Sequence, residues 1–494
     1  MSAGEDEIEL KFLCEPADLA AVLAAAPVGE TYEKTLVSTY FDTPQGDLRQ
    51  ARISLRIREG GAKRVQTLKR GDGFAREEHE KPIEGEGLDL TLGALKDALP
   101  AAKRATLSPI FTVRVVRRQR TFEYGGATIE MAVDEGEVQA GERTRRISEV
   151  ELELKAGDCD PMFDLARELS KTAPLYLSFD GKASQGQGLI DGTDRSPRRN
   201  DKAPLARGLT AAGAFQAIAR NTLVQIAANG VVLREADSVE AIHQLRVAVR
   251  RLRSTISTFK NLVDDDRTDD ITAELKWLAG ACDDARDFDV FAADAAALDD
   301  PALDLAPLLT AIEAARARGH AKACAAVASG RFRELVLETT AWVETGAWLT
   351  QGGKASAKRR DMPAERFAAK ALERRRKALL KRGADLQAQD DAGRHEARIA
   401  AKKLRYAAEA FAALFDAAAA KAFIKGLKRL QDQLGLMNDA AVAAALVERL
   451  KLKGKAQAAA GQLLALREAE RPKTAKAAVK AMAQVAAAPV FWGG

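Results

Sequence analysis

The stretch HQLRVAVRRLR at residues 243–253 recurs as HEARIAAKKLR at residues 395–405, with a histidine first and cations at matching later positions. The separation of 152 residues also relates Asp287 to Asp439, so the register extends well beyond the motif. Internal similarity of this kind indicates a duplicated unit whose two copies pack as related halves of one domain. The helical composition of both copies favours a bundle of long helices.

Each copy of the motif places its cations on one face of a helix. The first, fourth, eighth and eleventh positions fall within an arc of roughly 80° at 3.6 residues per turn. We call the residues at these positions the two basic stripes: His243, Arg246, Arg250 and Arg253, and His395, Arg398, Lys402 and Arg405. Like charges at this spacing repel one another, which favours a polyanion as ligand over a merely solvated face. Each histidine is either a donor to phosphate or a structural residue.

Composition limits the class of protein. The chain has 494 residues, 47% of them hydrophobic and 30% charged, which is typical of a soluble protein of several domains. The net charge of +5 is small beside 76 basic and 71 acidic residues, so local placement of charge matters more. The four cysteines are scattered and form no CxxC pair, which argues against a zinc ribbon and fits a reducing cytoplasm. An acidic N-terminus without a signal peptide, and no long apolar run, predict no membrane association.

Apolar and polar residues alternate in short runs from residue 7 to about residue 188. The runs are EIELKF, ISLRIRE, RVQTLKR, FTVRVVRR, ATIEMAV and SEVELELK. This period of two predicts a series of antiparallel strands. The polar class is almost wholly Glu, Arg and Lys, which favours a closed barrel with its charged faces turned inward.

The amino-acid composition and the spacing of apolar residues change after a polar segment at residues 189–206, which contains two prolines and is predicted to be a linker. From residue 207 onward Ala, Leu, Arg, Lys and Glu recur at helical spacing, which predicts an all-α domain. A break near residues 352–363 separates two repeats, at about 207–351 and 363–486. The expected fold class is therefore α+β, with separate strand-rich and helical domains at 5–188 and 207–486.

The charged strands supply candidate site residues. In EIELK, alternation puts Glu7, Glu9 and Lys11 on one face. Two later strands add the carboxylates of Glu130, Asp134, Glu149, Glu151 and Glu153. Oxygen ligands of this kind suit Mg²⁺ or Mn²⁺, and only some of these residues are needed for one metal site.

Cations accompany these carboxylates on neighbouring strands. They are Arg56 and Arg58 in LRIR, Lys69 in TLK, Arg76 in REEHE, and Arg114 and Arg117 in VRVVRR. Guanidinium groups match the oxygens of phosphate chains, and lysine supplies a point charge. The alternative is that these faces meet water and pair by salt bridges between strands.

The strand region resembles the CYTH family, the triphosphate tunnel metalloenzymes. EIELK matches the family's ExExK signature, and further matches follow in family order: YFDT (40–43), LRIR (55–58), TLK (67–69), REEHE (76–80), VDEG (133–136), SEVELEL (148–154) and the lysine of GKASQG, Lys182. The resemblance implies an antiparallel eight-stranded β-tunnel that hydrolyses or rearranges triphosphates with a divalent metal.

The resemblance also implies roles for individual residues. Those expected to ligate metal or orient the attacking water are Glu7, Glu9, Asp134, Glu149 and Glu151, with all but Asp134 counted as catalytic. Those expected to hold phosphates are Lys11, Arg56, Arg58, Lys69, Arg76, Arg117 and Lys182.

The helical region resembles the CHAD domain, a family with two four-helix repeats that is associated with polyphosphate binding. The two basic stripes carry the resemblance, together with ARDFDV (285–290) and LGLMNDAAV (434–442). The first repeat has Cys282-Asp283 where the second has Leu434-Gly435, and we expect this difference to affect a local helix–helix contact rather than the stripe.

Together these features predict a metal-dependent hydrolase of inorganic triphosphate whose helical domain binds polyphosphate. The chain has neither an adenine-reading motif nor a phosphate loop of the GxxxxGK[ST] kind. Within the CYTH family, a class IV adenylate cyclase or a thiamine triphosphatase remains an alternative. The other alternative is a non-catalytic protein that binds polyphosphate or nucleic acid. Only 5% of the residues are aromatic, which argues against stacking on the bases of single-stranded nucleic acid. Double-stranded nucleic acid is harder to exclude, because its phosphate backbone also binds basic helices. We do not expect nucleic acid to be the ligand. The oligomeric state is left open.

Overall fold

The computed structural model describes residues 5–61, 63–71, 75–199, 205–298 and 303–493. The side chains of residues 5–7, 75–76, 437–440 and 470–473 lie outside this description. Two compact units make up the chain: Met1–Arg198 with Arg333–Thr345, and Arg199–Phe332 with Gly346–Gly494. We call them the tunnel unit and the helical unit.

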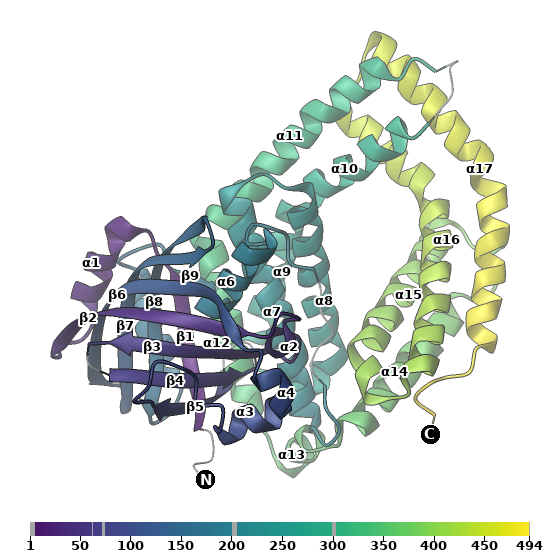
Figure 1. Cartoon of the computed structure of the whole chain (residues 1–494). Coiled ribbons are helices and arrows are strands. Elements are labelled where there is room, and N and C mark those ends of the chain that lie inside the picture. Colours follow the sequence, from purple (N-terminus) through teal and green to yellow (C-terminus); the bar gives the residue numbers. More distant parts are fainter. Residues whose placement is uncertain (1–4, 62, 72–74, 200–204, 299–302, 494) are drawn as a thin grey trace. The chain divides into compact units, whose positions relative to one another are not determined.

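The tunnel unit is an antiparallel barrel. Its strands are β1 (Glu5–Leu13), β2 (Thr31–Asp42), β3 (Ile53–Gly60), β4 (Lys63–Arg70), β5 (Ala75–Pro82), β6 (Ser108–Tyr124), β7 (Ala127–Ala140), β8 (Arg143–Ala156) and β9 (Tyr176–Ser178). They are hydrogen-bonded in the order β5-β4-β3-β2-β6-β7-β8-β1-β9, and β5 also pairs with β1. Eight strands therefore close a ring, and the three-residue β9 extends the edge of β1 beside β5. The predicted antiparallel tunnel is confirmed (Figure 1).

Helices cover the apolar outer face of the barrel. They are α1 (Leu19–Ala25), α2 (Asp47–Gln50), α3 (Gly93–Ala98), α4 (Ala101–Arg104), α5 (Asp160–Ser170) and most of α12 (Gly330–Thr345), with the short 3-10 turn η1 (Pro16–Asp18). Leu55 of β3 and Leu68 of β4, for example, pack against Leu95 of α3. Because side chains alternate along a strand, burying these residues outside turns the charged residues between them into the lumen. In contrast, α6 (Lys182–Asp191) packs on side chains that face the interior of the barrel.

Helix α12 comes from a distant part of the sequence. Arg167 of α5 donates two hydrogen bonds to the carboxylate of Glu338, at 2.6 and 3.0 Å. The guanidinium of Arg333 lies 5.1 Å from the ring centroid of Tyr176 in β9. These contacts attach residues 333–345 to the tunnel unit.

One end of the barrel interior is filled by apolar side chains. Val113 and Val115 share a face of β6 with Arg117, and Val138 shares a face of β7 with Asp134. The complete cluster, with Leu189 of α6, comprises Leu36, Tyr40, Phe111, Val113, Val115, Val138, Ala140, Ile147 and Leu189. The charged part of the lumen therefore ends at this apolar plug.

The helical unit contains two repeated sets of helices. The first set is α7 (Ala211–Glu235), α8 (Val239–Val263), α9 (Thr268–Ala281), α10 (Asp283–Ala296) and α11 (Ala306–Ala328). The second is α14 (Ala364–Arg382), α15 (Asp391–Phe411), α16 (Ala417–Leu450) and α17 (Gly454–Ala487). Between them lie the 3-10 turn η2 (Ala347–Leu349) and α13 (Lys354–Arg360), and η3 (Ala412–Leu414) follows α15.

The helix caps repeat with the sequence. The side chain of Ser238 accepts a hydrogen bond from the amide of Ala241 at the start of α8, and Asp390 does the same for Gly393 at the start of α15. These equivalent caps satisfy amides that the first turn leaves without a partner. The all-helical prediction for this region is confirmed.

The repeats differ at the position that the sequence marks. Helix α9 ends at Ala281 and α10 begins at Asp283, whereas α16 runs without interruption through the equivalent Leu434 and Gly435. At the break, Arg246 donates to the carbonyl of Cys282 at 3.1 Å and pairs with Asp283 at 2.5 Å. The local difference is thus a helix break held by a residue of the first stripe.

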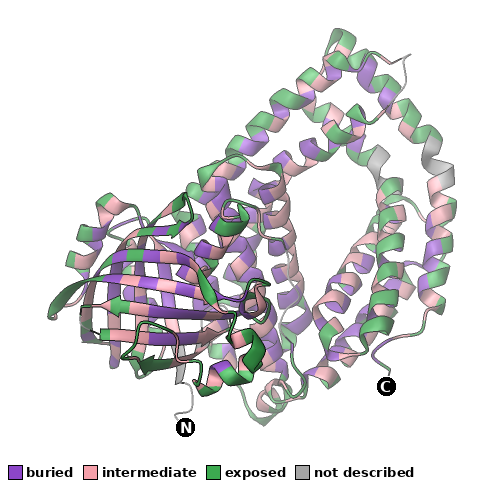
Figure 2. Cartoon of the chain, in the orientation of Figure 1, coloured by how far each residue is buried: buried purple, intermediate pink, exposed green. Residues whose placement is uncertain are grey.

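Each end of the helical unit is packed from both repeats. Phe215, Phe259, Phe367 and Phe411, from α7, α8, α14 and α15, form one aromatic cluster. Helices α10, α11, α16 and α17 share a second apolar core that includes Leu308 and Leu446. Buried residues accordingly run as stripes along these helices (Figure 2). Among the described residues, no helix is both long enough and apolar enough to span a bilayer.

Candidate functional site

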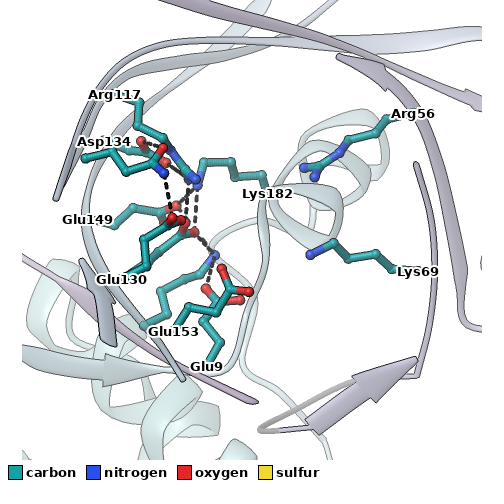
Figure 3. Close-up of polar contacts among 12 residues, drawn as sticks. Glu9, Arg56, Lys69, Arg117, Glu130, Asp134, Glu149, Glu153 and Lys182 are labelled. Atoms are coloured by element: carbon teal, nitrogen blue, oxygen red, sulfur yellow. Dashed lines mark hydrogen bonds and ion pairs between the residues drawn. The ribbon is translucent and has the colours of Figure 1, made fainter. Parts of the chain in front are cut away.

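The lumen of the barrel contains a charged cavity of about 240 Å³. Its charged lining residues are Glu9, Lys11, Lys34, Arg56, Arg58, Lys69, Glu78, Glu80, Arg117, Glu130, Glu151, Glu153, Lys155 and Lys182. The two signs are not evenly mixed. In Figure 3 the labelled carboxylates gather on one side of the lumen, and Arg56 and Lys69 project from the opposite side.

Three carboxylates form the centre of the acidic side. Asp134 of β7 lies opposite Glu149 of β8 in the strand register, and Glu151 follows two residues later on the same face. One carboxylate oxygen from each lies within 4.8 Å of the others, and both Asp134 and Glu149 are buried. Oxygen ligands converging in this way fit a hard divalent cation such as Mg²⁺ or Mn²⁺. We call these three residues the carboxylate cluster.

Cations hold the carboxylate cluster together. Arg117 donates to both oxygens of Asp134 at 2.7 and 2.6 Å and to Glu151 at 2.5 Å. Lys11 lies 2.7 Å from Glu151, and Lys182 contacts all three carboxylates. Burial raises the pKa of Glu151, but Lys11, Lys182 and Arg117 outweigh burial and hold this pKa well below its usual range. The Glu151 carboxylate is therefore ionised, as a metal ligand has to be.

A close helix–strand contact places Lys182 at the cluster. Lys182 is the first residue of α6, directly after the N-cap Gly181. Farther along the helix, a Cβ added at Gly186 would lie 2.2 Å from the ring of Phe111 on β6. The glycine therefore lets α6 pack directly on the apolar plug, with its first residue reaching into the charged lumen.

The opposite wall offers hydrogen-bond donors. Arg56 of β3 donates to the hydroxyl of Tyr40 at 3.4 Å, while the Nε groups of Arg56 and Arg58 are buried without a hydrogen-bond partner among the described residues. Burial, with the charges of Arg56 and Arg117, lowers the pKa of Arg58 to about 10. Buried donors normally find acceptors. This wall also contains Glu78, which lies 3.2 Å from Lys69 and 4.0 Å from Arg56, but cations remain in excess. The buried Nε donors indicate an anionic ligand with several oxygens, for which phosphate is the closest geometric match.

The two basic stripes interact within the helical unit. Burial lowers the pKa of Lys402 to about 8, and Arg398 and Arg405 on its own helix and Arg250 and Arg246 on α8 add to this shift. The two stripes are thus close enough to repel each other.

An aromatic ring lies among the cations of the stripes. The guanidinium groups of Arg250 and Arg405 lie 5.5 and 5.0 Å from the ring centroid of Tyr406. The buried side-chain atoms for which the described part of the chain offers no hydrogen-bond partner include Nε of Arg250, Arg253, Arg398 and Arg405 and the hydroxyl of Tyr406. The stripes therefore present unused donors beside concentrated positive charge.

Comparison with known proteins identifies both parts. Residues 5–186 match the model of the CYTH domain, and residues 217–448 match that of the CHAD domain. The chain is a CYTH domain followed by a CHAD domain.

Two known proteins are similar to parts of this chain. An inorganic triphosphatase from Haemophilus influenzae is 32% identical over 191 residues, which are 36% of this chain and 54% of that protein. The match thus spans about half the length of that relative. The crystal structure of the CHAD domain from the plant Ricinus communis is 31% identical, with a TM-score of 0.51 over 58% of this chain and 96% of that one.

The CYTH domain brings the predicted tunnel residues together. Those that line the cavity are Glu9, Lys11, Arg56, Arg58, Lys69, Arg117, Glu151 and Lys182, and Asp134 and Glu149 belong to the carboxylate cluster. Glu7 and Arg76 are paired in the register of β1 and β5, but their side chains lie outside the described residues. Arg114 is exposed, because an odd spacing from Arg117 places it on the outer face of β6.

Some cavity residues of the CYTH domain were not predicted. Lys155 continues the alternation of Glu149, Glu151 and Glu153 on β8, so the period of two could have found it. Lys34 and Tyr40 of β2 also line the cavity. Around Lys34 the strand has no clear alternation of polar and apolar residues, whereas Tyr40 is the first residue of the YFDT motif, so the family resemblance could have found it.

The histidines of the CHAD domain differ in environment. His243 is half-buried, and burial with nearby Arg286 lowers its pKa, whereas His395 is exposed. His320 is buried, with its ring nitrogens 2.6 Å from Asp237 and 2.9 Å from Asp289, as expected of a packing residue. The environments of His243 and His395 do not assign either histidine a role in binding.

Proposed function

We propose that this protein is a metal-dependent hydrolase of inorganic triphosphate, and that its CHAD domain binds polyphosphate. The observation that carries the proposal is the division of the CYTH lumen: a carboxylate cluster on one side and, on the other, the buried Nε groups of Arg56 and Arg58, for which the described side chains offer no acceptor. A triphosphate with bound metal needs both at once. The likeness to the inorganic triphosphatase of Haemophilus influenzae supports the same substrate.

The carboxylate cluster would hold Mg²⁺ or Mn²⁺, with Glu7 and Glu9 of β1 as further ligands in the proposal. The metal would supply positive charge that polarises the phosphoryl group and favours attack by water. Glu9 lies beside Lys11, at 3.6 Å, and is proposed to orient that water and to accept its proton.

The cationic wall would bind the part of the substrate that leaves. Arg56, Arg58 and Lys69 would hold the two phosphates that are not attacked and stabilise the charge that develops on the leaving pyrophosphate. The water oxygen bonds to the terminal phosphorus, the bridging P–O bond breaks, and orthophosphate and pyrophosphate are released. Positioning and charge stabilisation carry the rate, since phosphoryl transfer needs little covalent help.

In the CHAD domain, the two stripes would bind a longer chain of phosphates. The unused Nε groups of Arg250, Arg253, Arg398 and Arg405 support this assignment, because a polyphosphate provides acceptors along its whole length. Duplex nucleic acid offers phosphates at a fixed helical spacing and is the competing ligand in a test. A cytoplasmic location is also part of the proposal, supported by the four cysteines being free thiols.

The test is phosphate release by the purified full-length chain from inorganic triphosphate, ATP, thiamine triphosphate and long-chain polyphosphate, each with Mg²⁺, Mn²⁺ or chelator. We expect metal-dependent release with the highest kcat/KM on inorganic triphosphate. Formation of cyclic AMP from ATP, or a preference for thiamine triphosphate, would replace the proposed substrate. No release from any substrate would contradict the hydrolase and leave binding as the function.

Binding by the CHAD domain is tested separately. Fluorescently labelled polyphosphate should bind the full-length chain with an affinity that falls as salt is raised, and unlabelled polyphosphate should displace it better than duplex DNA of equal phosphate concentration. Better displacement by DNA would reassign the stripes to nucleic acid.

A further inference from the structure

Lys182 occupies the centre of the carboxylate cluster. Its Nζ lies 2.6 Å from Asp134 and 2.8 Å from Glu151, and it also hydrogen-bonds Glu149. The ammonium donates hydrogen bonds to Glu149 and Glu151 and forms an ion pair with Asp134, so it occupies the space between the three carboxylates. A divalent metal bound by the same carboxylates needs the same lone pairs, at still shorter distances. The ammonium and the metal therefore compete for one set of oxygens.

We propose that Lys182 is an exchangeable internal cation, which neutralises the carboxylate cluster before metal binds and moves to the phosphate-binding wall when metal enters. The proposal rests on the proposed function only for the identity of the phosphate ligand. The competition itself concerns groups within this chain.

Charge balance favours the exchange. Among the described side chains, the carboxylate cluster and Glu9 meet three cations, Lys11, Arg117 and Lys182. Adding a dication while all three cations stay would raise the positive charge of this buried group by two, which is unfavourable. Release of one monovalent cation offsets half of that increase.

Geometry identifies Lys182 as the cation that leaves. Arg117 is fixed by a two-point contact with Asp134, whereas Lys182 holds the cluster through a single atom at the end of a flexible stem. Lys11 does not share this position, because its contacts are with Glu9, Glu149 and Glu151 rather than with Asp134. Rotation of the Lys182 side chain can free the cluster without moving the backbone.

The cationic wall is within reach of the displaced ammonium. In Figure 3 the Lys182 side chain extends across the lumen between the carboxylates and the side that carries Arg56 and Lys69. Lys182 lines the same cavity as Arg56 and as Tyr40, whose hydroxyl accepts a hydrogen bond from Arg56. Metal binding would thus add one positive charge to the wall that holds phosphate, so that metal and triphosphate strengthen each other's binding.

The test measures binding of Mn²⁺ alone, without any phosphate, to the full-length chain by loss of the free-ion EPR signal. Lys182→Met, which removes the ammonium and keeps the length, is expected to bind Mn²⁺ at least about ten times more tightly than the wild type. Two matched variants serve as controls. Lys171→Met, on the exposed face of α5 beside Glu168, should change the affinity by less than about twofold. Lys11→Met removes one charge near the same carboxylates and measures the general electrostatic effect.

An equal gain in Lys182→Met and Lys11→Met would overturn the proposal, because loss of charge alone would then explain both. Unchanged or weaker binding by Lys182→Met would also overturn it, provided that circular dichroism shows a folded protein. If that variant fails to fold, a crystal structure of the wild type with Mn²⁺ decides: we expect Lys182 Nζ to have left Asp134 and Glu149. Persistence of both contacts beside a bound ion would refute the exchange. Neither readout depends on turnover, so a failed triphosphatase assay leaves both interpretable.

Discussion

Replacing Lys402 by arginine changes how the proposed polyphosphate binding depends on pH. In the free protein, burial and the cations of both stripes lower the pKa of Lys402 to about 8, so its ammonium is about nine-tenths protonated at pH 7 and about one-tenth protonated at pH 9. A bound polyanion supplies the missing negative partner and favours the charged form. We take the bound pKa to be at least the ordinary value of 10.5.

The magnitude follows from linkage between protonation and binding. With pKa values of about 8 in the free state and about 10.5 in the bound state, affinity should fall about tenfold between pH 7 and pH 9. The sign is fixed by the direction of the shift: the depressed pKa belongs to the free state, so binding takes up protons. At pH 8 the uptake should be about half a proton per stripe pair.

The assay is fluorescence anisotropy of labelled polyphosphate at constant ionic strength, with calorimetry in two buffers of different ionisation enthalpy for the proton count. In Lys402→Arg the affinity should be nearly constant over this range, because a guanidinium stays charged. The matched control Lys403→Arg, on the exposed neighbour of Lys402, should keep the tenfold fall. Parallel pH profiles for the wild type and Lys402→Arg would refute the reasoning.

Three further predictions concern the tunnel. Asp134→Asn should destabilise the barrel by about 3 kcal/mol, because Arg117 loses a buried charged partner. The control Glu135→Gln, on the outer face of the same strand, should cost less than about 0.5 kcal/mol. Hydrogen exchange of the β6–β8 amides measures both free energies, and equal values would contradict the prediction. Burial raises the pKa of Asp134, but Lys182 and Arg117 outweigh burial and lower this pKa below its ordinary value. The ionised Asp134 should therefore contribute fully to the free energy of unfolding above about pH 4, and this contribution should be lost as the pH falls through the lowered pKa. Gly186→Ala should cost about 1–3 kcal/mol in thermal unfolding, since its Cβ would meet the Phe111 ring at 2.2 Å; an unchanged Tm would show that α6 is not held by this contact.

The barrel could be predicted because its strands carry an unusually clear alternation. Leu55 and Arg56 illustrate it: one packs under α3, and the next points into the lumen. Period two assigns the face of each residue once the strand is known, and this is also why Arg114 lies outside while Arg117 lies inside. The repeat of 152 residues likewise predicted that α8 and α15 are equivalent helices. Their N-caps, Ser238 and Asp390, are also 152 residues apart.

Packing between segments that are far apart in the chain could not be predicted from the sequence. The segment RELVLETTAWVET has helical spacing and a charged fraction close to the 30% of the whole chain, so nothing local distinguishes α12 from other helices of the sequence. Its place in the tunnel unit depends on contacts such as that between Arg167 and Glu338, which are 171 residues apart. The contacts of Lys182 with all three members of the carboxylate cluster are another case, since they depend on how α6 packs on Phe111.

The most direct measurement for the tunnel as a catalytic site is kcat/KM for inorganic triphosphate with saturating Mg²⁺ or Mn²⁺, in the wild type, Glu151→Gln and Glu137→Gln. Glu151 lines the cavity and belongs to the carboxylate cluster, whereas Glu137 is an exposed residue of β7. We expect a loss of at least about a hundredfold for Glu151→Gln, wild-type activity for Glu137→Gln, and no activity with chelator. Full activity in a folded Glu151→Gln protein would contradict it and would place the chemistry outside the carboxylate cluster.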